Sequence, residues 1–515
     1  MKYVLGIDYG TGGGKVVLVD ENADVVKYAF KEYQIFTDYP GWSEHDPADY
    51  WNLACELIPK VLSESGVYAE DVKAVAVSSA MPSLVMVDKT GNPVSRAYNL
   101  MDKRATEEVA QLRDSIGDEA IFDLTKNRLD DHPMIVNLLW EKHHRPEVFS
   151  KIHKALSIDG FVTSKLTGCF SAHYSGAAFY GVAYDLVNRR FDSDMLARIG
   201  LPESLFPDLY RCEAIVGEVT KKASQETHLA EGTPVCAGQV DCNAGWSGAG
   251  AIEPGDMQMN LGTCGNFGII HDKPVFHNSM IAFNYTTDSE NTYITVPTTT
   301  TGGHLIRYLR DNYYKAEHKV WAAEGKDIFD LINQEAEVIP PCSEGLLVLP
   351  YMMGERTPIW DVYARGVVFG LSLHHTRGHL VRAMMESVAF ALYDSFRLIQ
   401  ETGVEIHTPI VLNEGGAKSR LWRRIITDVF NLPTVMVENR VGAPYGDALL
   451  AGISIGMFKD FSIAKEKASY VNRMEPDETM HKRYMEYFVL YKDLYTHVKQ
   501  DFRTLSDINS RYATT

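Results

Sequence analysis

The chain opens with two apolar runs that flank a glycine-rich turn. Val4 to Ile7 is apolar and ends at Asp8, and Val16 to Val19 follows the turn at residues 10–14. This pattern predicts a β-hairpin, and Val25 to Phe30 is predicted as a third antiparallel strand. Because glycines permit positive φ and let a ligand approach backbone N–H groups, the turn is a candidate ligand site. An ordinary tight hairpin capped by its aspartate has the same pattern.

Several groups in this hairpin suit a phosphate or a metal ion. Asp8, at the end of the first strand, is a candidate for holding a hydrated metal ion. Thr11 and Lys15 are candidates for facing a phosphate, with Gly12 between them in the turn. We therefore expect cofactor binding here.

The same pattern recurs near the middle of the chain. Ile7-Asp-Tyr-Gly-Thr-Gly-Gly13 matches Met259-Asn-Leu-Gly-Thr-Cys-Gly265 in residue type and order, and both copies lie between apolar runs. Internal repetition of this kind predicts two similar halves. We expect each half to offer one Gly-Thr turn to a shared cleft, where the two turns hold a chain of phosphates. The predicted domains are 1–253 and 254–515.

Helical patterns alternate with these strands. Asp46 and Pro47 are typical of a helix start, the apolar spacing that follows is helical, and Gly66 ends the helix. Val72 to Val77 is predicted as a strand, and residues 84–94 as a hairpin. In the second half, a long helix is predicted from His379 to about Glu401. The order of elements favours an α/β protein.

Composition narrows the function classes. Apolar residues make up 45% and charged residues 23%, as in globular proteins, and 515 residues suffice for two domains or more. The net charge of −18 argues against a nucleic-acid or anionic-membrane partner. Seven scattered cysteines without metal-ligand spacing indicate free thiols. We expect a cytoplasmic protein without a signal peptide or a membrane span.

Asp241 is the candidate general base. It follows a buried-type strand, Pro234 to Val240, and precedes a small-residue stretch that includes Gly245 and Gly248. A helix N-terminus stabilises the charge of a carboxylate and the strand fixes its position. Such a carboxylate suits the orientation and deprotonation of a hydroxyl. The alternative interpretation is a structural N-cap.

Two further segments are candidate substrate contacts. Met81 and Pro82 lie in a stretch of small residues between a strand and a hairpin, as the wall of a site requires. Asp102 and Arg104 place a carboxylate and a guanidinium close together, which suits the hydroxyls of a polyol. The alternative for Asp102 and Arg104 is a surface ion pair.

A strand–Gly-Gly–helix junction lies in the second half. The strand Pro409 to Leu412 is followed by Gly415, Gly416, Ala417 and Ser419, and then by a predicted helix. Helix N–H groups point at a ligand placed there, so the junction is a candidate nucleotide site, although a tight turn has the same pattern.

The chain resembles the FGGY carbohydrate kinases from about residue 3 to residue 500. The motifs that carry the resemblance are Gly6-Ile-Asp-Tyr-Gly-Thr11, Gly41-Trp-Ser-Glu-His-Asp-Pro47, Asp241 with its glycines, Leu261-Gly-Thr-Cys-Gly265, Gly354-Glu-Arg-Thr-Pro358, Ala364-Arg-Gly366 and Gly415-Gly-Ala417. The resemblance implies two actin-like (ribonuclease-H-like) domains with a central cleft, ATP with Mg²⁺, and phosphorylation of a sugar or polyol hydroxyl. It implies Asp241 as the catalytic base and places Thr11, Thr263, Gly302, Gly416 and Ala417 near the nucleotide.

The substrate is less closely defined by these motifs. Residues 42–47 and the Asp241 region are similar to xylulokinases, which favours a pentulose such as xylulose. Xylulokinases, however, have Met-His where this chain has Met81-Pro82, and Trp-Asn where it has Leu100-Met101. Ser78 to Met81 is closer to gluconate kinases. Gluconate or a sugar alcohol is therefore the alternative substrate.

A function of another class is an actin-like or chaperone-like ATPase that binds a protein partner. No segment after residue 460 resembles a peptide-binding domain, and Asp241 would have no evident role. A homodimer is left open.

Overall fold

The computed structural model describes residues 1–438 and 441–512, which form two compact units. Unit 1 comprises residues 1–254, 270–294 and 439–468, and unit 2 comprises residues 255–269, 295–438 and 469–515. The predicted domain boundary at 253/254 assigns 270–294 and 439–468 to the second domain, whereas the structure groups both segments with unit 1. Within the described residues, no helix is both long and apolar enough to cross a bilayer.

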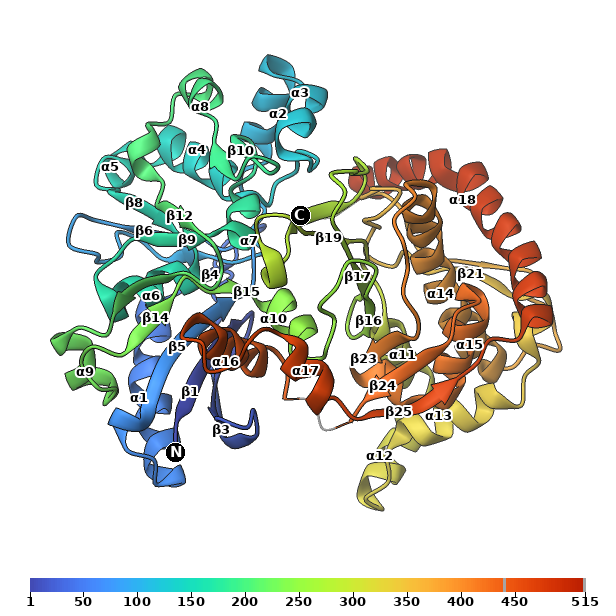
Figure 1. Ribbon diagram of the computed structural model, residues 1–515. Helices are drawn as coiled ribbons and strands as arrows, with labels where there is room; N and C mark the ends of the chain where they lie inside the picture. The colour runs from blue at the N-terminus through green and yellow to red at the C-terminus, as the bar shows by residue number, and fades with distance from the viewer. Residues whose placement is uncertain (439–440, 513–515) are drawn as a thin grey trace. The chain divides into compact units, whose positions relative to one another are not determined.

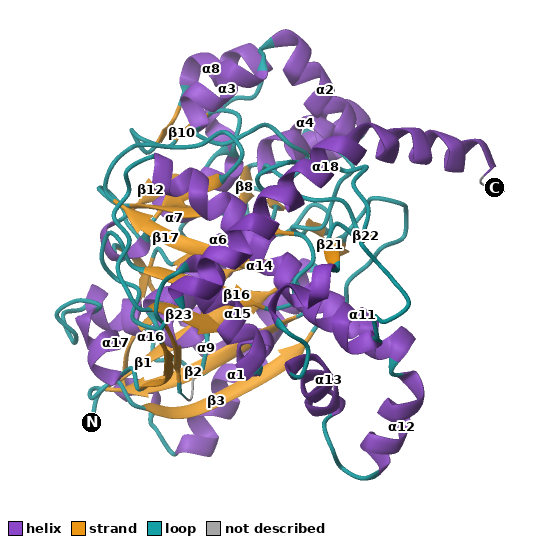
Figure 2. Ribbon diagram, turned by 90° about the vertical axis from the view of Figure 1, so that its right-hand side faces the viewer, coloured by secondary structure: helices purple, strands orange, loops and turns teal. Residues whose placement is uncertain are grey.

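Unit 1 is built on a mixed sheet in the order β13-β14-β5-β1-β2-β3, with β15 also paired to β5 (Figures 1 and 2). Its strands are β1 Tyr3–Gly10, β2 Gly13–Asp20, β3 Val25–Glu32, β5 Val72–Ser79, β13 Ile215–Glu218, β14 Pro234–Cys236 and β15 Gln239–Val240. The three predicted N-terminal strands are confirmed as an antiparallel meander, and β5 pairs parallel to β1.

Helices cover both faces of this sheet. On β1, Leu5, Ile7 and Tyr9 join one apolar cluster with α1 (Pro47–Ser65) and α6 (Ile158–Thr167). Val4 lies on the other face, in a second cluster with α16 (Ala443–Ser454). Because side chains alternate along a strand, Gly6 and Asp8 share the α16 face with Val4.

The predicted helix boundaries at Asp46 and Gly66 are confirmed. The Asp46 carboxylate accepts a hydrogen bond of 2.9 Å from the Ala48 N–H, and Gly66 ends α1 in the left-handed conformation. The predicted 84–94 hairpin is confirmed, because the Asp88 N–H donates to the Asn92 carbonyl and the Val94 N–H to the Met86 carbonyl, both at 2.9 Å. In addition, β6 (Val85–Val87) pairs along its length with β8 (Lys154–Leu156).

Unit 1 contains further helices and strands. The helices are α2 Thr106–Ser115, α3 Asp118–Thr125, α4 Met134–His144, α5 Pro146–Phe149, α7 Tyr174–Ala177, α8 Ser193–Ile199, α9 Lys221–Thr227, α10 Asp241–Ser247 and α17 Ser462–Lys467. The strands are β4 Glu44–His45, β7 Ala97–Tyr98, β9 Ser171–His173, β10 Tyr184–Asp185, β11 Arg190–Phe191, β12 Asp208–Tyr210 and β18 Ile281–Asn284.

Unit 2 repeats the arrangement of unit 1, in which β1 forms a hairpin with β2 and pairs parallel with β5. In the strand order β17-β16-β23-β24-β25, β16 pairs antiparallel with β17 and parallel with β23. Its strands are β16 Met257–Leu261, β20 Thr298–Thr299, β21 Leu347–Leu349, β22 Val367–Phe369, β23 Ile410–Asn413, β24 Thr434–Val437 and β25 Tyr470–Met474. Two further strands, β17 (Gly265–His271) and β19 (Tyr293–Val296), span the unit boundary. The β16–β17 hairpin corresponds to β1–β2, which confirms the predicted repeat.

The helices of unit 2 include the long helix predicted from sequence. They are α11 Gly303–Tyr313, α12 Lys315–Ala323, α13 Ile328–Glu337, α14 Arg377–Glu401, α15 Arg420–Phe430 and α18 Glu478–Tyr512. Helix α14 begins two residues before the predicted start and is held by a capping box at Thr376. The apolar spacing predicts one face with Leu380, Met384, Val388 and Leu392, of which the last three are buried and Leu380 is half-buried.

The approach of α16 to β1 depends on the absence of a side chain at Gly6. A Cβ atom there would lie 1.9 Å from the Pro444 carbonyl oxygen and 2.6 Å from the Ala448 nitrogen, both of them backbone atoms. We predict that Gly6→Ala lowers the free energy of unfolding by about 1–3 kcal/mol or more, because a backbone shift is needed to relieve the overlap.

Gly12→Ala is the matched control, because a Cβ at this position in the same hairpin meets nothing within 4 Å. Thermal and urea unfolding of the two variants, followed by circular dichroism, make the comparison. Equal stability of both variants would contradict the close docking of α16.

Candidate active site

The carboxyl ends of three adjacent parallel strands carry the polar core of unit 1. Asp8 on β1 is in register with Ser78 on β5, and Ser78 is in register with Gln239 on β15. Asp241 follows β15 directly, as the first residue of α10. Ligands in α/β proteins bind at this end of parallel strands, so the register assembles candidate chemistry from distant parts of the sequence.

Asp8 is buried and ion-paired. Its Oδ2 atom lies 2.9 Å from Lys15 Nζ, and its Oδ1 atom lies 3.3 Å from Ser78 Oγ. Lys15 is therefore a partner of the predicted metal-binding carboxylate, in addition to its predicted role towards a phosphate. Thr11 and Gly12 form the turn between β1 and β2, and open space surrounds the Cα of Gly12 on its side-chain side.

Asp241 is half-buried, and its carboxylate accepts a 2.6 Å hydrogen bond from the Cys242 N–H. The helix N-cap is Val240, so Asp241 is not itself the cap. Burial and the nearby Asp8 carboxylate raise the pKa of Asp241 to about 7. A carboxylate with a pKa near neutrality is suited to accept a proton from a hydroxyl at working pH.

A further polar residue at this site, Asp447 on α16, is not among the candidates predicted from the sequence. Its carboxyl group is buried, with Ser78 Oγ at 2.7 Å and Gln239 Nε2 at 3.0 Å. No local signal in the sequence indicates this contact, because Asp447 and Ser78 are 369 residues apart.

Asp102 and Arg104 form a buried ion pair, so the alternative of a surface pair is wrong. Arg104 Nη2 lies 2.6 Å from Asp102 Oδ2 and 2.8 Å from Glu44 Oε1, and the Asp102 carboxylate also accepts from the Ser43 N–H. The guanidinium lies 3.7 Å from the Trp42 ring centroid and 4.0 Å from that of Tyr98. Arg104 Nη1 is buried and has no hydrogen-bond partner among the described residues.

Met81 and Pro82 are half-buried in the loop after β5. The Met81 methyl group packs against Gly176 of α7, where a Cβ would lie 2.9 Å from it. His173 is buried nearby. It bonds to Asp159 at 3.0 Å, and the Gly176 N–H donates to its Nδ1 atom.

Three backbone segments converge in unit 2 around Thr263. The Gly302 N–H donates to the Thr263 carbonyl at 2.9 Å and the Gly303 N–H to the Gly262 carbonyl. A Cβ at Gly302 would lie 2.5 Å from Cys264, and one at Gly416 would lie 2.7 Å from Leu261. The structure therefore brings together the segments that contain the predicted nucleotide residues Thr263, Gly302, Gly416 and Ala417. Glycines allow these segments to pack closely.

Gly415 and Ser419, which flank Gly416 and Ala417, differ in how far they are available to a ligand. A Cβ at Gly415 would meet nothing within 4 Å, so its backbone is open to a ligand. Ser419 caps α15, because its Oγ accepts from the Trp422 N–H and donates to Asn333 Oδ1 at 2.5 Å. Its hydroxyl is thus engaged within unit 2.

Glu355, from the Gly354–Pro358 motif, fixes the loop that leads into α11. Its buried carboxylate accepts from Thr299 Oγ1 at 2.5 Å and from the Thr300 N–H at 2.7 Å. Burial raises the pKa of Glu355. The motif therefore supports the backbone that precedes Gly302 and Gly303.

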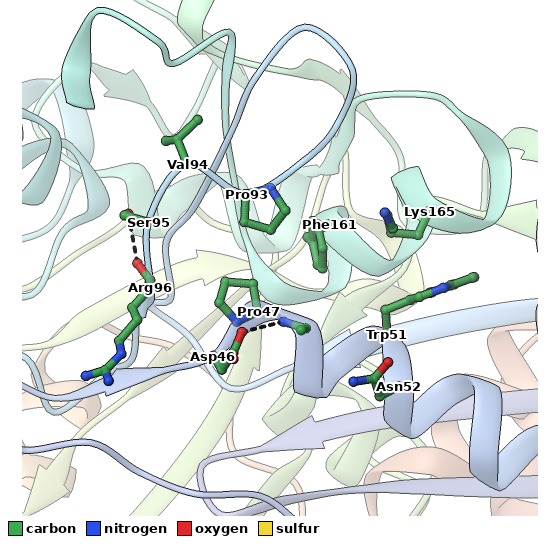
Figure 3. Close-up of a pocket in the computed structure, with 11 residues that line it drawn as sticks. Asp46, Pro47, Trp51, Asn52, Pro93, Val94, Ser95, Arg96, Phe161 and Lys165 are labelled. Carbon is green, nitrogen blue, oxygen red and sulfur yellow. Dashed lines mark hydrogen bonds between the residues drawn. The ribbon is translucent and has the colours of Figure 1, made fainter. Parts of the chain in front are cut away.

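Figure 3 shows a separate cavity of about 460 Å³ in unit 1. Its walls come from the start of α1, residues 93–96 and α6, and none of the predicted site residues lines it. Arg96 at its edge pairs with Asp38 at 2.7 Å, and Trp51 Nε1 donates to Glu226. These partners leave the cavity without a clear chemical role.

The comparisons with known proteins agree with the geometry. Residues 3–248 match the N-terminal domain model of the FGGY family of carbohydrate kinases, and residues 257–455 match the C-terminal one. The chain is 30% identical to a xylulose kinase of Bacillus subtilis (strain 168), over 97% of this chain and 98% of that protein. It is 25% identical to a gluconokinase of the same strain, over 98% of both chains.

Solved structures show the same fold. The chain is similar to the xylulose kinase of Rhodospirillum rubrum, with a TM-score of 0.89 and 26% identity, over 98% of this chain and 100% of that one. The gluconate kinase of Lactobacillus acidophilus has a TM-score of 0.90 at 23% identity, over 98% and 99%, and supports the fold alone. The predicted fold of two actin-like domains is confirmed. The chain belongs to the FGGY family of carbohydrate kinases.

Proposed function

We propose that this carbohydrate kinase phosphorylates a pentulose such as xylulose, with ATP as the phosphoryl donor and Mg²⁺ as the metal ion. The relatives named xylulose kinase support this substrate, and those named gluconokinase support gluconate as the alternative. The observation that carries the proposal is the position of Asp241. It is a half-buried carboxylate with a raised pKa at the carboxyl ends of parallel strands, where a hydroxyl can be deprotonated.

The residues of unit 1 fit the binding of a hydrated divalent cation. Asp8 and Asp241 are oxygen donors, which Mg²⁺ prefers, and Lys15 is the cation that pairs with Asp8. Asp8 is the proposed ligand. When bound, Mg²⁺ neutralises charge on the transferring phosphoryl group. Lys15 orients the Asp8 carboxylate through its 2.9 Å ion pair and adds positive charge close to the phosphates.

The proposed nucleotide contacts are mainly backbone groups. Thr11 and Gly12 in unit 1, and Thr263, Gly302, Gly415, Gly416 and Ala417 in unit 2, are proposed to bind ATP, because glycine-rich turns expose N–H groups to phosphates. Ser419 is proposed to act through the α15 N-terminus that it caps.

In the proposed reaction, the oxygen of the sugar hydroxyl attacks the γ-phosphorus of ATP. The new O–P bond forms as the bond between the γ-phosphorus and the bridging oxygen breaks, and ADP leaves with that electron pair. Asp241 accepts the hydroxyl proton. Such transfer depends mainly on positioning and charge stabilisation, so one base and a backbone cradle suffice.

Met81, Pro82, Asp102 and Arg104 are proposed to contact the sugar. The buried Arg104 Nη1, without a partner among the described residues, is a donor that a substrate hydroxyl could satisfy. Met81 and Pro82 offer half-buried apolar surface in the loop after β5. Homodimer formation stays a prediction.

The first test measures ADP release with ketopentoses, aldonates and sugar alcohols, and then compares Asp241→Asn with the wild type on the preferred substrate. We expect turnover to fall about 10²–10⁴-fold, because a positioned general base contributes that much. ATP affinity, measured by calorimetry, should not change. Wild-type turnover in the variant would show that Asp241 is not the base.

The raised pKa of Asp241 predicts a pH dependence. The carboxylate must be unprotonated to accept a proton, and its pKa is about 7, so kcat/KM for the sugar should rise as pH increases through about 7. Below that value, each pH unit should lower it about ten-fold. The residual kcat/KM of the Asp241→Asn variant should not show this rise with pH. A midpoint near the ordinary pKa of an aspartate would contradict the assignment.

Arg104→Lys tests the proposed sugar contact. Lysine keeps the positive charge beside Asp102 but loses the second guanidinium nitrogen, so KM for the sugar should rise about 10–100-fold, as expected for a lost hydrogen bond involving a charged group. KM for ATP should stay unchanged. Arg96→Lys is the control, because Arg96 pairs with the exposed Asp38. An unchanged sugar KM in a folded Arg104→Lys variant would restrict Arg104 to a structural role.

A further inference from the structure

The Asp447 carboxyl group is not used by the reaction proposed above, although it lies among the residues that carry it. Asp8 is 1% exposed, and Ser78, Gln239 and Asp447 are each 0% exposed. The first three are neighbours across the register of β1, β5 and β15, and α16 brings Asp447 onto them (Figure 1). A buried polar group of this kind must find partners within the protein.

The Ser78 hydroxyl lies between two carboxyl groups. Its oxygen is 2.7 Å from Asp447 Oδ2 and 3.3 Å from Asp8 Oδ1. A serine hydroxyl has one hydrogen and can therefore donate to only one of the two carboxyl groups. If both aspartates were ionised, one of the two contacts between Ser78 Oγ and a carboxylate oxygen would have no hydrogen between the two oxygen atoms and would be repulsive. An additional hydrogen on one carboxyl group removes this conflict.

The surroundings indicate which carboxyl group carries that hydrogen. Asp8 has the Lys15 ammonium as a counter-charge at 2.9 Å. The hydrogen-bond partners of Asp447 are neutral, namely Ser78 and the Gln239 side-chain amide, and no cation pairs with it among the described residues. An ionised carboxylate that is buried without a counter-charge is strongly unfavourable.

The neighbouring charges act in the same direction. Burial, and then the Asp8 carboxylate, raise the pKa of Asp447 well above its ordinary value, and Asp241 adds to this effect. When carboxyl groups share a site, one of them commonly keeps its proton. The neutral form of Asp447 also matches its partners, because its carbonyl oxygen accepts from Gln239 while its hydroxyl is free to donate to Ser78.

We infer that Asp447 is held as the uncharged acid and donates its hydrogen to Ser78 Oγ, so that the Ser78 hydroxyl donates to Asp8 Oδ1. The chain of hydrogen bonds runs in one direction, from α16 through β5 to β1. Asp447 is thus a positioning residue, which fixes one oxygen of Asp8 while Lys15 holds the other. This inference rests on the proposed role of Asp8 in holding the metal ion.

The decisive comparison is between Asp447→Asn and Ser78→Ala. Asparagine is neutral, donates through its amide nitrogen and accepts through its oxygen, so it reproduces both proposed bonds of Asp447. We expect turnover and the Mg²⁺ concentration for half-maximal rate to stay within about three-fold of wild type. Ser78→Ala breaks the chain at its centre. It should lower turnover, or raise the Mg²⁺ requirement, about 10–100-fold, as for a lost hydrogen bond to a charged group.

A spectroscopic measurement tests the inference without turnover. The infrared difference spectrum between the wild-type enzyme and Asp447→Asn, both free of substrate, should contain the carbonyl band of a protonated carboxylic acid. Circular dichroism confirms that both variants are folded. Loss of function in Asp447→Asn equal to that in Ser78→Ala, wild-type Mg²⁺ dependence in Ser78→Ala, or absence of the carbonyl band would each overturn the inference.

The same assay separates this inference from the proposed function. An active Asp241→Asn variant would contradict the proposed base, whatever Asp447 does. Kinase activity that requires Asp241 but is lost in a folded Asp447→Asn variant would contradict only the hydrogen-bond chain.

Discussion

The burial of acidic groups beside the Lys15 ammonium is the constraint on which the polar site of unit 1 depends. Asp8 is fully buried and Asp241 half-buried, and the cation bonded to Asp8 is Lys15. Buried charge is tolerated only where partners are held in place. The pairing of β1 with β5, and of β5 with β15, supplies that placement. The glycine at position 6 lets α16 close over the sheet and add its own polar contacts.

Unit 2 has the same strand arrangement, but a neutral asparagine lies where unit 1 has the charged Asp8. Asn260 on β16 is in register with Asn413 on β23, as Asp8 is with Ser78. Both asparagines bond to amides, Asn260 to Asn266 and Asn413 to Gln258. A carboxylate at this point would repel a triphosphate, whereas neutral side chains and exposed N–H groups do not. This difference is consistent with the proposed roles, in which the acid–base residue lies in unit 1 and the nucleotide contacts of unit 2 are neutral.

Much of this could be predicted from the sequence, because it depends on local patterns. The hairpins, the α1 caps, the long helix α14 and both Gly-Thr turns follow from spacing and from turn residues within a few positions of each other. The features that could not be predicted depend on contacts between residues far apart in the sequence. The burial of Arg104 requires Trp42 and Tyr98 around its guanidinium, and the contact between Ser78 and Asp447 joins residues 369 positions apart. Segment 439–468 likewise folds with unit 1 although it lies late in the chain.

The family can be predicted from the sequence more readily than the substrate, because the proposed phosphate contacts are backbone groups and the proposed sugar contacts are side chains. The proposed phosphate contacts around Thr263 and Gly302 are main-chain groups, and glycines mark such turns in the sequence. The proposed sugar contacts are side chains such as Met81 and Arg104, whose orientation is set by packing between distant segments. Relatives named for xylulose and for gluconate share one fold with this chain. With the proposed roles, a change of sugar needs new side chains on unit 1 and no change in the backbone turns proposed to bind the phosphates.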